Sequence, residues 1–362
     1  MSETIDSATG GARPAEPRLV IFGVTGQLGQ ELIERLDQSD WSIAELVGVA
    51  SKQSVGQTFD FRGEELDVLG EWPVLKGRDL VFLCTRGVDA LEVVRECLRA
   101  QVPCLDLTGA LSSQAEVPLA TATATAIASG EPGADGDAMA AAPLIALPSA
   151  TTLAWTAVLE AIGEVAGITR VVGTVMSSAS CLGRRGLVSL SEESIALFNQ
   201  SESAESGPAG QNVAFDVLPG GGIDADRIRS ELGRLFGEAL RVDVAGVLVP
   251  TFVGEGTSLA IELERPLERG VLEASLEAGI GVRVVADGFG SRGLTAVEDG
   301  AAEPIGPTLR DAGGTDEVWV GRIEADASVS AGQGWRIWLA SDPVHLAANH
   351  ALRVAGRRLG LS

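Results

Sequence analysis

The sequence predicts an α/β protein with a doubly wound parallel sheet and a second, α+β domain. Short apolar runs alternate with amphipathic segments over residues 18–107, and such alternation of strands and helices favours a parallel sheet. A glycine-rich turn, residues 23–29, lies directly between the first apolar run and the first amphipathic segment. Longer apolar runs follow residue 170, which is typical of an antiparallel or mixed sheet.

The helices and strands of the first domain are predicted from the spacing of apolar residues along the chain. Residues 18–22 form an apolar run ended by glycine and are expected to be a buried strand. Apolar residues at helical spacing predict a helix over 30–36. The same criteria predict strands at 44–50, 79–84 and 102–107, and a helix at 88–100.

Residues 112–142 interrupt this alternation. The segment is rich in Ala, Thr, Gly, Asp and Pro and contains an Ala-Thr repeat at 120–126. We expect a loop-rich, partly mobile insertion.

The second domain is predicted to begin with a helix over 151–165. Apolar periodicity then predicts strands at 170–176, 242–253, 259–263, 282–286 and 318–323, a polar loop at 199–211 and a terminal helix at 343–361. The expected division of the chain is a disordered tail at 1–17, a first domain at 18–150 completed by the helix at 343–362, and a second domain at 151–342.

Composition excludes several classes of protein. The 362 residues are 45% hydrophobic without a run long enough to cross a membrane, and the N-terminus lacks the pattern of a signal peptide. The net charge of −23 disfavours nucleic acid and anionic membranes. The four cysteines show no metal-ligand spacing, so we expect no metal and a reducing, cytoplasmic environment.

The glycine-rich turn predicts a dinucleotide-binding loop. Glycines let the backbone turn tightly and approach a pyrophosphate, which the N-terminus of the following helix attracts. Because a strand precedes the turn and a helix follows it, we expect a Rossmann-like domain. The alternative is a tight turn that holds no ligand. The cofactor-binding candidates here are Gly23, Thr25, Gly26, Gln27, Leu28 and Gly29.

The end of the second strand favours NADP over NAD. Proteins that bind NAD usually have a carboxylate there, which binds the ribose hydroxyls. This chain has Ser51, Lys52, Gln53 and Ser54 instead, and Lys52 is suited to a 2′-phosphate. Ser51, Lys52 and Ser54 complete the candidate cofactor site, although an ordinary solvated lysine explains Lys52 equally well.

An ordered series of motifs resembles the aspartate-semialdehyde dehydrogenase family over nearly the whole chain. Beside the glycine loop, these motifs are Ser51–Gly56 with Phe61–Glu64, Asp79–Cys84, Leu105–Ala110, Pro148–Thr151, Ala214–Pro219, Val249–Gly254, Asp316–Ile323 and Trp338–Asp342. The resemblance implies a Rossmann domain, a dimerisation domain, a homodimer, and a C-terminal helix that returns to the first domain.

The same resemblance implies that the catalytic residues have been lost. The family's nucleophilic cysteine becomes Ala150, and its histidine becomes Glu255. The glutamine that holds the intermediate becomes Met176, and the two substrate-binding arginines become Leu248 and Ser112. The pattern resembles the Usg-type paralogues of the family, which also lack the cysteine. A substrate-lid motif survives weakly as Asp224 and Arg227, and the late cofactor-side motif is altered at residues 343–347.

Three residues near this site remain candidates for a catalytic role. Ser149 is expected to cap a helix, and as a nucleophile it would need one of the only two histidines, His345 or His350. Cys181 is more typical of a small buried thiol than of a nucleophile, and Glu255 is either a base or a solvated carboxylate. Arg184 and Arg185 are expected to be exposed rather than anion-binding.

Two functions from different classes follow. The first is a catalytically degenerate, dimeric homologue that retains NADP-binding capacity and serves as an interaction or regulatory protein for an unidentified protein partner. The second is an NAD(P)-dependent semialdehyde oxidoreductase of amino-acid biosynthesis with a different mechanism or substrate, since direct hydride transfer to a carbonyl needs no cysteine. An N-acetyl-glutamyl-phosphate reductase is disfavoured because it also requires the cysteine.

Overall fold

The computed structural model describes residues 16–85, 88–120, 142–201, 207–285 and 306–361, and the side chains of residues 88 and 89 are not described. The predicted tail at 1–17 therefore lies outside the described residues apart from its last two positions. Most of the predicted insertion, residues 121–141, also lies outside them.

The first sheet has seven strands in the order β3-β4-β2-β1-β5-β6-β7. Every neighbouring pair is parallel except the β3–β4 hairpin at the edge. The predicted Rossmann-like parallel sheet is confirmed. Its strands are β1 (Arg18–Phe22), β2 (Glu45–Val49), β3 (Thr58–Phe61), β4 (Glu64–Leu69), β5 (Leu80–Leu83), β6 (Cys104–Asp106) and β7 (Leu144–Ala146).

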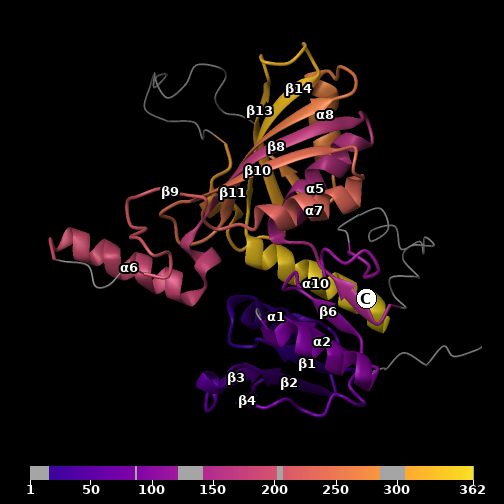
Figure 1. Ribbon diagram of the computed structural model, residues 1–362, viewed down its shortest axis with the longest axis vertical. Coiled ribbons are helices and arrows are strands. Elements are labelled where there is room, and N and C mark those ends of the chain that lie inside the picture. The colour runs from indigo at the N-terminus through magenta and orange to yellow at the C-terminus, as the bar shows by residue number, and fades with distance from the viewer. Residues whose placement is uncertain (1–15, 86–87, 121–141, 202–206, 286–305, 362) are drawn as a thin grey trace, which may run out of the picture.

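Helices cover both faces of this sheet. Successive side chains of a strand point to opposite faces, so Leu19 and Ile21 of β1 pack in one cluster and Val20 and Phe22 in another. The first cluster includes residues of α1 (Gln27–Gln38) and of the terminal helix α10 (Pro343–Leu359), which lies against α1. The second includes residues of α2 (Val88–Ala100). The C-terminal helix thus completes the first hydrophobic core (Figure 1).

The second sheet also has seven strands, in the order β12-β13-β14-β11-β8-β10-β9. The pairs β8–β10 and β12–β13 are parallel and the others are antiparallel, so the predicted mixed sheet is confirmed. Its strands are β8 (Ile168–Ser177), β9 (Leu218–Pro219), β10 (Arg241–Leu248), β11 (Glu255–Leu263), β12 (Val282–Val284), β13 (Val318–Ala325) and β14 (Gly334–Ser341).

Three helices pack around the core of the second sheet. They are α5 (Ala150–Gly163), α7 (Ala225–Phe236) and α8 (Arg269–Ala278). The ring of Trp155 is fully buried against Gly173, where a methyl group would overlap it. By contrast, α6 (Arg184–Phe198) stands away from both sheets (Figure 1). The remaining described helices are η1 (Lys52–Ser54), η2 (Ala179–Leu182) and α9 (Leu309–Ala312).

Several sequence-based expectations need correction. The strand expected over 242–253 ends at Leu248, because the chain turns at 249–251 and Pro250 has no N–H group for a sheet. Residues 112–120, the described start of the expected insertion, are turns and bends as expected, but they are anchored to the first sheet: Leu119 forms a parallel bridge with Ala146, and both it and Ala120 are buried. The β3–β4 hairpin, β14, α6 and α7 were not predicted. Among the described residues, no helix combines the length and apolarity needed to cross a membrane.

Candidate functional site

The predicted cofactor loop connects β1 to α1. Gly23 has a positive φ of 93°, which favours glycine. A methyl group at Gly29 would overlap the carbonyl oxygen of Gly23, so the helix approaches the loop too closely for any larger residue. Gly26, the N-cap of α1, brings no side-chain hydrogen bond to the first turn. These features fit a backbone cradle for a dinucleotide pyrophosphate.

The other cofactor candidates lie beside this loop. The hydroxyl of Ser54 in η1 lies 3.4 Å from the hydroxyl of Thr25. This contact connects the segment after β2 to the glycine loop. Ser51 and Lys52 are exposed. A cationic side chain is therefore accessible at the position expected to meet the 2′-phosphate of NADP.

A rigid loop follows β6 at the same edge of the first sheet. The fully buried Asp106 accepts hydrogen bonds from the backbone N–H of Thr108 at 2.8 Å and from its hydroxyl at 2.6 Å. It also accepts one from the N–H of Leu111 at 2.8 Å. Ser112 ends this loop, and its hydroxyl is bonded to the carbonyl of Gly109 at 3.1 Å.

Ala150 is the first residue of α5. Ser149 is the N-cap, and its hydroxyl accepts a hydrogen bond from the N–H of Thr152 at 3.1 Å, as expected for a cap. The Thr152 hydroxyl lies 2.8 Å from it as well. Ala150, which the sequence resemblance predicts to stand in place of a nucleophile, therefore carries a methyl group beside a hydroxyl that is already engaged.

Glu255 begins β11 and lies next to this helix end. Its carboxylate accepts a hydrogen bond from the Thr151 hydroxyl at 3.1 Å, and Ser177 lies opposite it in the β11–β8 register. Burial raises the pKa of Glu255 from 4.5 to about 7, against the opposing effect of the Thr151 and Ser177 hydroxyls. The carboxylate is 7% exposed, so it is not the solvated loop residue that one alternative predicted.

The strand register places two further positions of the predicted site around Glu255. Met176 pairs with Gly256 across β8 and β11, and Leu248 pairs with Ser177 across β10 and β8. Leu248 is buried. The fold thus gathers Ala150, Glu255, Met176 and Leu248 at one end of the second sheet.

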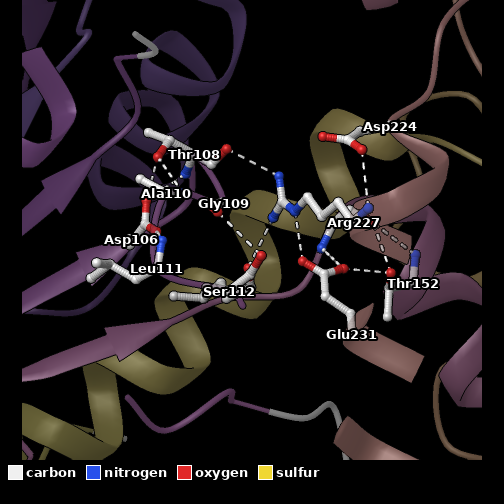
Figure 2. Close-up of polar contacts among 12 residues, drawn as sticks. Asp106, Thr108, Gly109, Ala110, Leu111, Ser112, Thr152, Asp224, Arg227 and Glu231 are labelled. Carbon is white, nitrogen blue, oxygen red and sulfur yellow. Dashed lines mark hydrogen bonds and ion pairs between the residues drawn. The ribbon is translucent and has the colours of Figure 1, made fainter. Parts of the chain in front are cut away.

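A buried ion pair joins this end of the sheet to the Asp106 loop (Figure 2). Arg227 and Glu231 of α7 are bonded from Nε to Oε1 at 2.6 Å. The same guanidinium donates to the carbonyls of Thr108 and Leu147, each at 3.1 Å. Two turns further along α7, Arg234 donates to the carbonyls of Ser112 and Val117. Two arginines of α7 therefore bind the backbone of the first domain.

The histidines do not complete a catalytic pair with Ser149. The Nδ1 of His345 lies 2.7 Å from Arg35 and 3.2 Å from Glu31. The Nε2 of His350 lies 2.9 Å from the carbonyl of Ala120, and burial lowers its pKa to about 4. Both histidines of the chain therefore have structural partners outside the degenerate site.

Neither the thiols nor the possible metal ligands of the described residues form an evident reactive centre beside Ala150. Cys181 lies in η2, close to Ser177 through their shared contact with Gly222, and is half-buried. Burial raises the pKa of Cys84, which leaves it protonated near neutral pH. Within the described ranges no group of three or more His, Cys, Asp or Glu residues is placed to hold a metal ion. Arg184 and Arg185 begin α6, and both are exposed, as expected from the sequence.

Sequence analysis missed Glu231 and Arg234. The signal was present, since Arg227, Glu231 and Arg234 follow the spacing i, i+4, i+7 of one helix face. Asp224 accepts from the N–H of Arg227 and caps that helix. Recognition of the helix would have placed the three side chains together.

Two family models match the chain. One, described as the NAD-binding domain of semialdehyde dehydrogenase, matches residues 18–128. The other, described as the semialdehyde dehydrogenase dimerisation domain, matches residues 159–345.

Individual relatives match at low identity over nearly full length. The aspartate-semialdehyde dehydrogenase of Legionella pneumophila is 26% identical, over 93% of this chain and 94% of its own. The crystal structure of aspartate-semialdehyde dehydrogenase II from Vibrio cholerae aligns with a TM-score of 0.79 at 25% identity, covering 94% of this chain and 97% of that one. A Candida albicans aspartate-semialdehyde dehydrogenase solved with NADP has a TM-score of 0.64 at 14% identity, covering 94% and 99%, and shares the fold alone. The chain therefore belongs to the family of semialdehyde dehydrogenases that includes the aspartate-semialdehyde dehydrogenases.

Proposed function

We propose that this chain is a catalytically inactive member of its family that retains the dimeric fold and binds NADP. The observation that carries the proposal is the end of α5, where Ala150 takes the place of a nucleophile and the neighbouring Ser149 hydroxyl caps the helix. A methyl group forms no thioester, and loss of a nucleophile commonly costs several powers of ten in rate. From the same residue, Ala150, we propose that the chain belongs to the Usg-type subgroup of the family.

The other proposed losses support inactivity. Met176 and Leu248 have no polar group that could hold a charged substrate. Ser112 lacks the length and the charge of an arginine, its hydroxyl already donates to the carbonyl of Gly109, and its own carbonyl accepts from Arg234. Glu255 has replaced a histidine, and its neighbours in the fold are hydroxyls rather than a thiol. One compensating residue cannot replace five independent groups.

The proposal that NADP binding is retained is supported by the glycine loop and by the residues that follow β2. When bound, the dinucleotide would supply a hydride donor or acceptor, and this chain's own part would be to hold it. Gly23, Thr25, Gly26, Gln27, Leu28 and Gly29 would surround the pyrophosphate, and Ser51, Lys52 and Ser54 the adenosine ribose and its phosphate.

The proposed homodimer rests on exposed apolar side chains of α6 and the loops beside it. The rings of Phe198 and Phe215 meet edge to face at 5.5 Å, and they are 76% and 68% exposed. A patch of this kind on a soluble protein marks an interaction surface. We name it the α6 patch; its residues are Val188, Ile195, Leu197, Phe198, Phe215, Val217, Phe252 and Val253. A further protein partner and a cytoplasmic location belong to the same proposal.

One observation favours the second candidate, an NAD(P)-dependent semialdehyde oxidoreductase with another mechanism. A carboxyl group with a pKa of about 7 can hold or release a proton at neutral pH, and Glu255 is such a group. Direct hydride exchange with a carbonyl would need that proton and no thiol.

Two measurements on the purified protein separate these candidates. The first is oxidation of aspartate semialdehyde with phosphate and NADP, followed at the nicotinamide absorbance; we expect no rate above the blank. The second is a titration of NADP and of NAD against the fluorescence of the six tryptophans, where we expect tighter binding of NADP. Phosphate-dependent turnover by the wild type would end the proposed inactivity. Failure to bind either dinucleotide would end the second candidate and also the NADP-binding part of the first.

A further inference from the structure

An exposed aromatic side chain lies at the edge of the first sheet that carries the glycine loop. Trp72 comes three residues after the end of β4, and its ring meets the ring of Phe22 at 5.6 Å with an interplanar angle of 84°. Phe22 is the last residue of β1 and directly precedes Gly23 of the glycine loop. The indole of Trp72 therefore lies beside the place proposed for the pyrophosphate.

The ring of Trp72 has a face to offer to a ligand. Its side chain is 42% exposed, whereas the other five tryptophans of the chain are buried or half-buried. A perpendicular contact with one neighbouring ring covers at most one face of an indole, so Phe22 leaves at least one face of Trp72 uncovered. A planar base can stack on such a face.

The segment after β4 is packed against the segment after β2. The N–H of Ala50 donates to the carbonyl of Leu69 at 2.9 Å. Gly70 lies directly against Val55, because a methyl group at Gly70 would overlap a methyl carbon of that side chain. Val55 is itself exposed. Together with Trp72, it gives this edge of the sheet a partly apolar surface.

The glycine loop is joined to the same place. The N–H groups of Gly23 and Val24 donate to the carbonyl of Val49, the last residue of β2, at 2.8 and 3.1 Å. The carboxyl ends of β1, β2 and β4 thus meet, and ligands of open parallel sheets bind at this edge. The adenosine half of a dinucleotide would extend from the glycine loop toward these strand ends.

The charges at this edge favour a base rather than a phosphate beside Trp72. The charged residues of 51–56 and 70–74 are Lys52 and Glu71, and both are exposed. Lys52 suits a phosphate, whereas Glu71 directly precedes Trp72 and would repel one. The surface at Trp72 therefore suits a group that is planar and uncharged, and the adenine ring is such a group.

We propose that Trp72 is the stacking platform for the adenine ring of the dinucleotide, with Val55 beside it on the same surface. Neither residues 23–29 nor residues 51–54 include an aromatic side chain, so the other candidate cofactor residues supply no ring for the base. The inference rests on the proposed function in taking NADP binding as given, and it is independent of catalytic inactivity.

The probe for the test is adenosine 2′,5′-bisphosphate, which carries the adenine, ribose and 2′-phosphate of NADP but no nicotinamide. Its binding to the full-length protein is measured by isothermal titration calorimetry, and tryptophan emission is recorded over the same concentrations. Wild type should bind the probe with a change in emission, because a stacked base alters the emission of an indole. Trp72→Ala should raise the Kd about 5- to 100-fold. Trp72→Phe keeps an aromatic face, so it should raise the Kd less but still abolish the change in emission.

The matched control is Trp41→Phe. Trp41 also belongs to the first domain, but it precedes β2, at the opposite edge of the sheet, and packs against Gly356 of α10. This variant also removes one tryptophan, and it should keep both the Kd of wild type and the change in emission. A rise in Kd equal to that of Trp72→Ala would show a general effect of losing an indole and would overturn the inference.

Two results would overturn the inference while NADP binding stands. One is binding of the probe by wild type without a change in emission, and the other is an equal Kd for wild type and a Trp72→Ala protein that circular dichroism shows to be folded. The first of these needs no variant, so the inference stays testable even where Trp72→Ala fails to fold. Failure of wild type to bind both the probe and NADP would instead end the proposed NADP binding, and the inference with it.

Discussion

Replacement of Glu255 by glutamine should stabilise the protein at neutral pH and leave it unchanged in mild acid. Glutamine keeps the size of the side chain and can keep the hydrogen bond with Thr151. The variant removes only the capacity to carry a buried negative charge.

The magnitude follows from the pKa of Glu255. Burial raises it in the folded protein to about 7, whereas the unfolded chain has the ordinary value near 4.5. Below pH 4.5 both states hold the proton, and no penalty arises. Between pH 4.5 and 7 the folded state still holds a proton that the unfolded state has lost, so rising pH favours unfolding by about 1.4 kcal/mol per pH unit. Above pH 7 the accumulated loss in the free energy of unfolding is about 3 kcal/mol, and the Glu255→Gln variant should not show this loss.

The assay is urea unfolding of both proteins at several pH values between 5 and 8, at one protein concentration, because the stability of the proposed dimer would depend on protein concentration. The advantage of Glu255→Gln should grow with pH across this range and level off above pH 7. Glu277→Gln, which removes an exposed carboxylate from α8, serves as the control and should stay within about 0.5 kcal/mol of wild type. A constant difference between Glu255→Gln and wild type from pH 5 to 8 would refute the buried-carboxylate reasoning.

Three further changes test the cofactor loop, the second core and the dimer. Gly29→Ala should abolish the NADP-dependent change in tryptophan fluorescence, because the methyl group would displace the Gly23 carbonyl; unchanged affinity would contradict the proposed cradle. Trp155→Ala should cost about 3–5 kcal/mol in urea unfolding, since the ring is fully buried in the second core, and a loss under 1 kcal/mol, roughly that of a surface change, would contradict that packing. Phe215→Asp should shift sedimentation from dimer to monomer with the circular dichroism spectrum retained, and an intact dimer would exclude the α6 patch as its interface.

Local sequence predicted most of the first domain. The run 18–22, the turn 23–29 and the helix after it are each encoded by near neighbours, and β1 and α1 formed at those places. Errors arose where local pattern is weak. The β3–β4 hairpin does alternate apolar and polar residues, with Phe59 and Phe61 in β3 and Leu66 and Val68 in β4, but its strands are only four and six residues long, so the pattern is short. The strand expected to reach residue 253 stops at Leu248, where a proline follows within two residues.

The sequence by itself determined which chemical groups are present: the glycine loop, Lys52 after the second strand, an alanine at position 150, and only two histidines. It did not determine what those groups contact. Only the tertiary structure decided that Glu255 is buried beside Thr151, that both histidines bond elsewhere, and that Glu231 meets Arg227, Ser149 and Thr152. The physical reason is range: a strand or turn depends on residues a few positions apart, whereas Ser149 and Glu231 are 82 positions apart and meet only because both domains fold around α5 and α7.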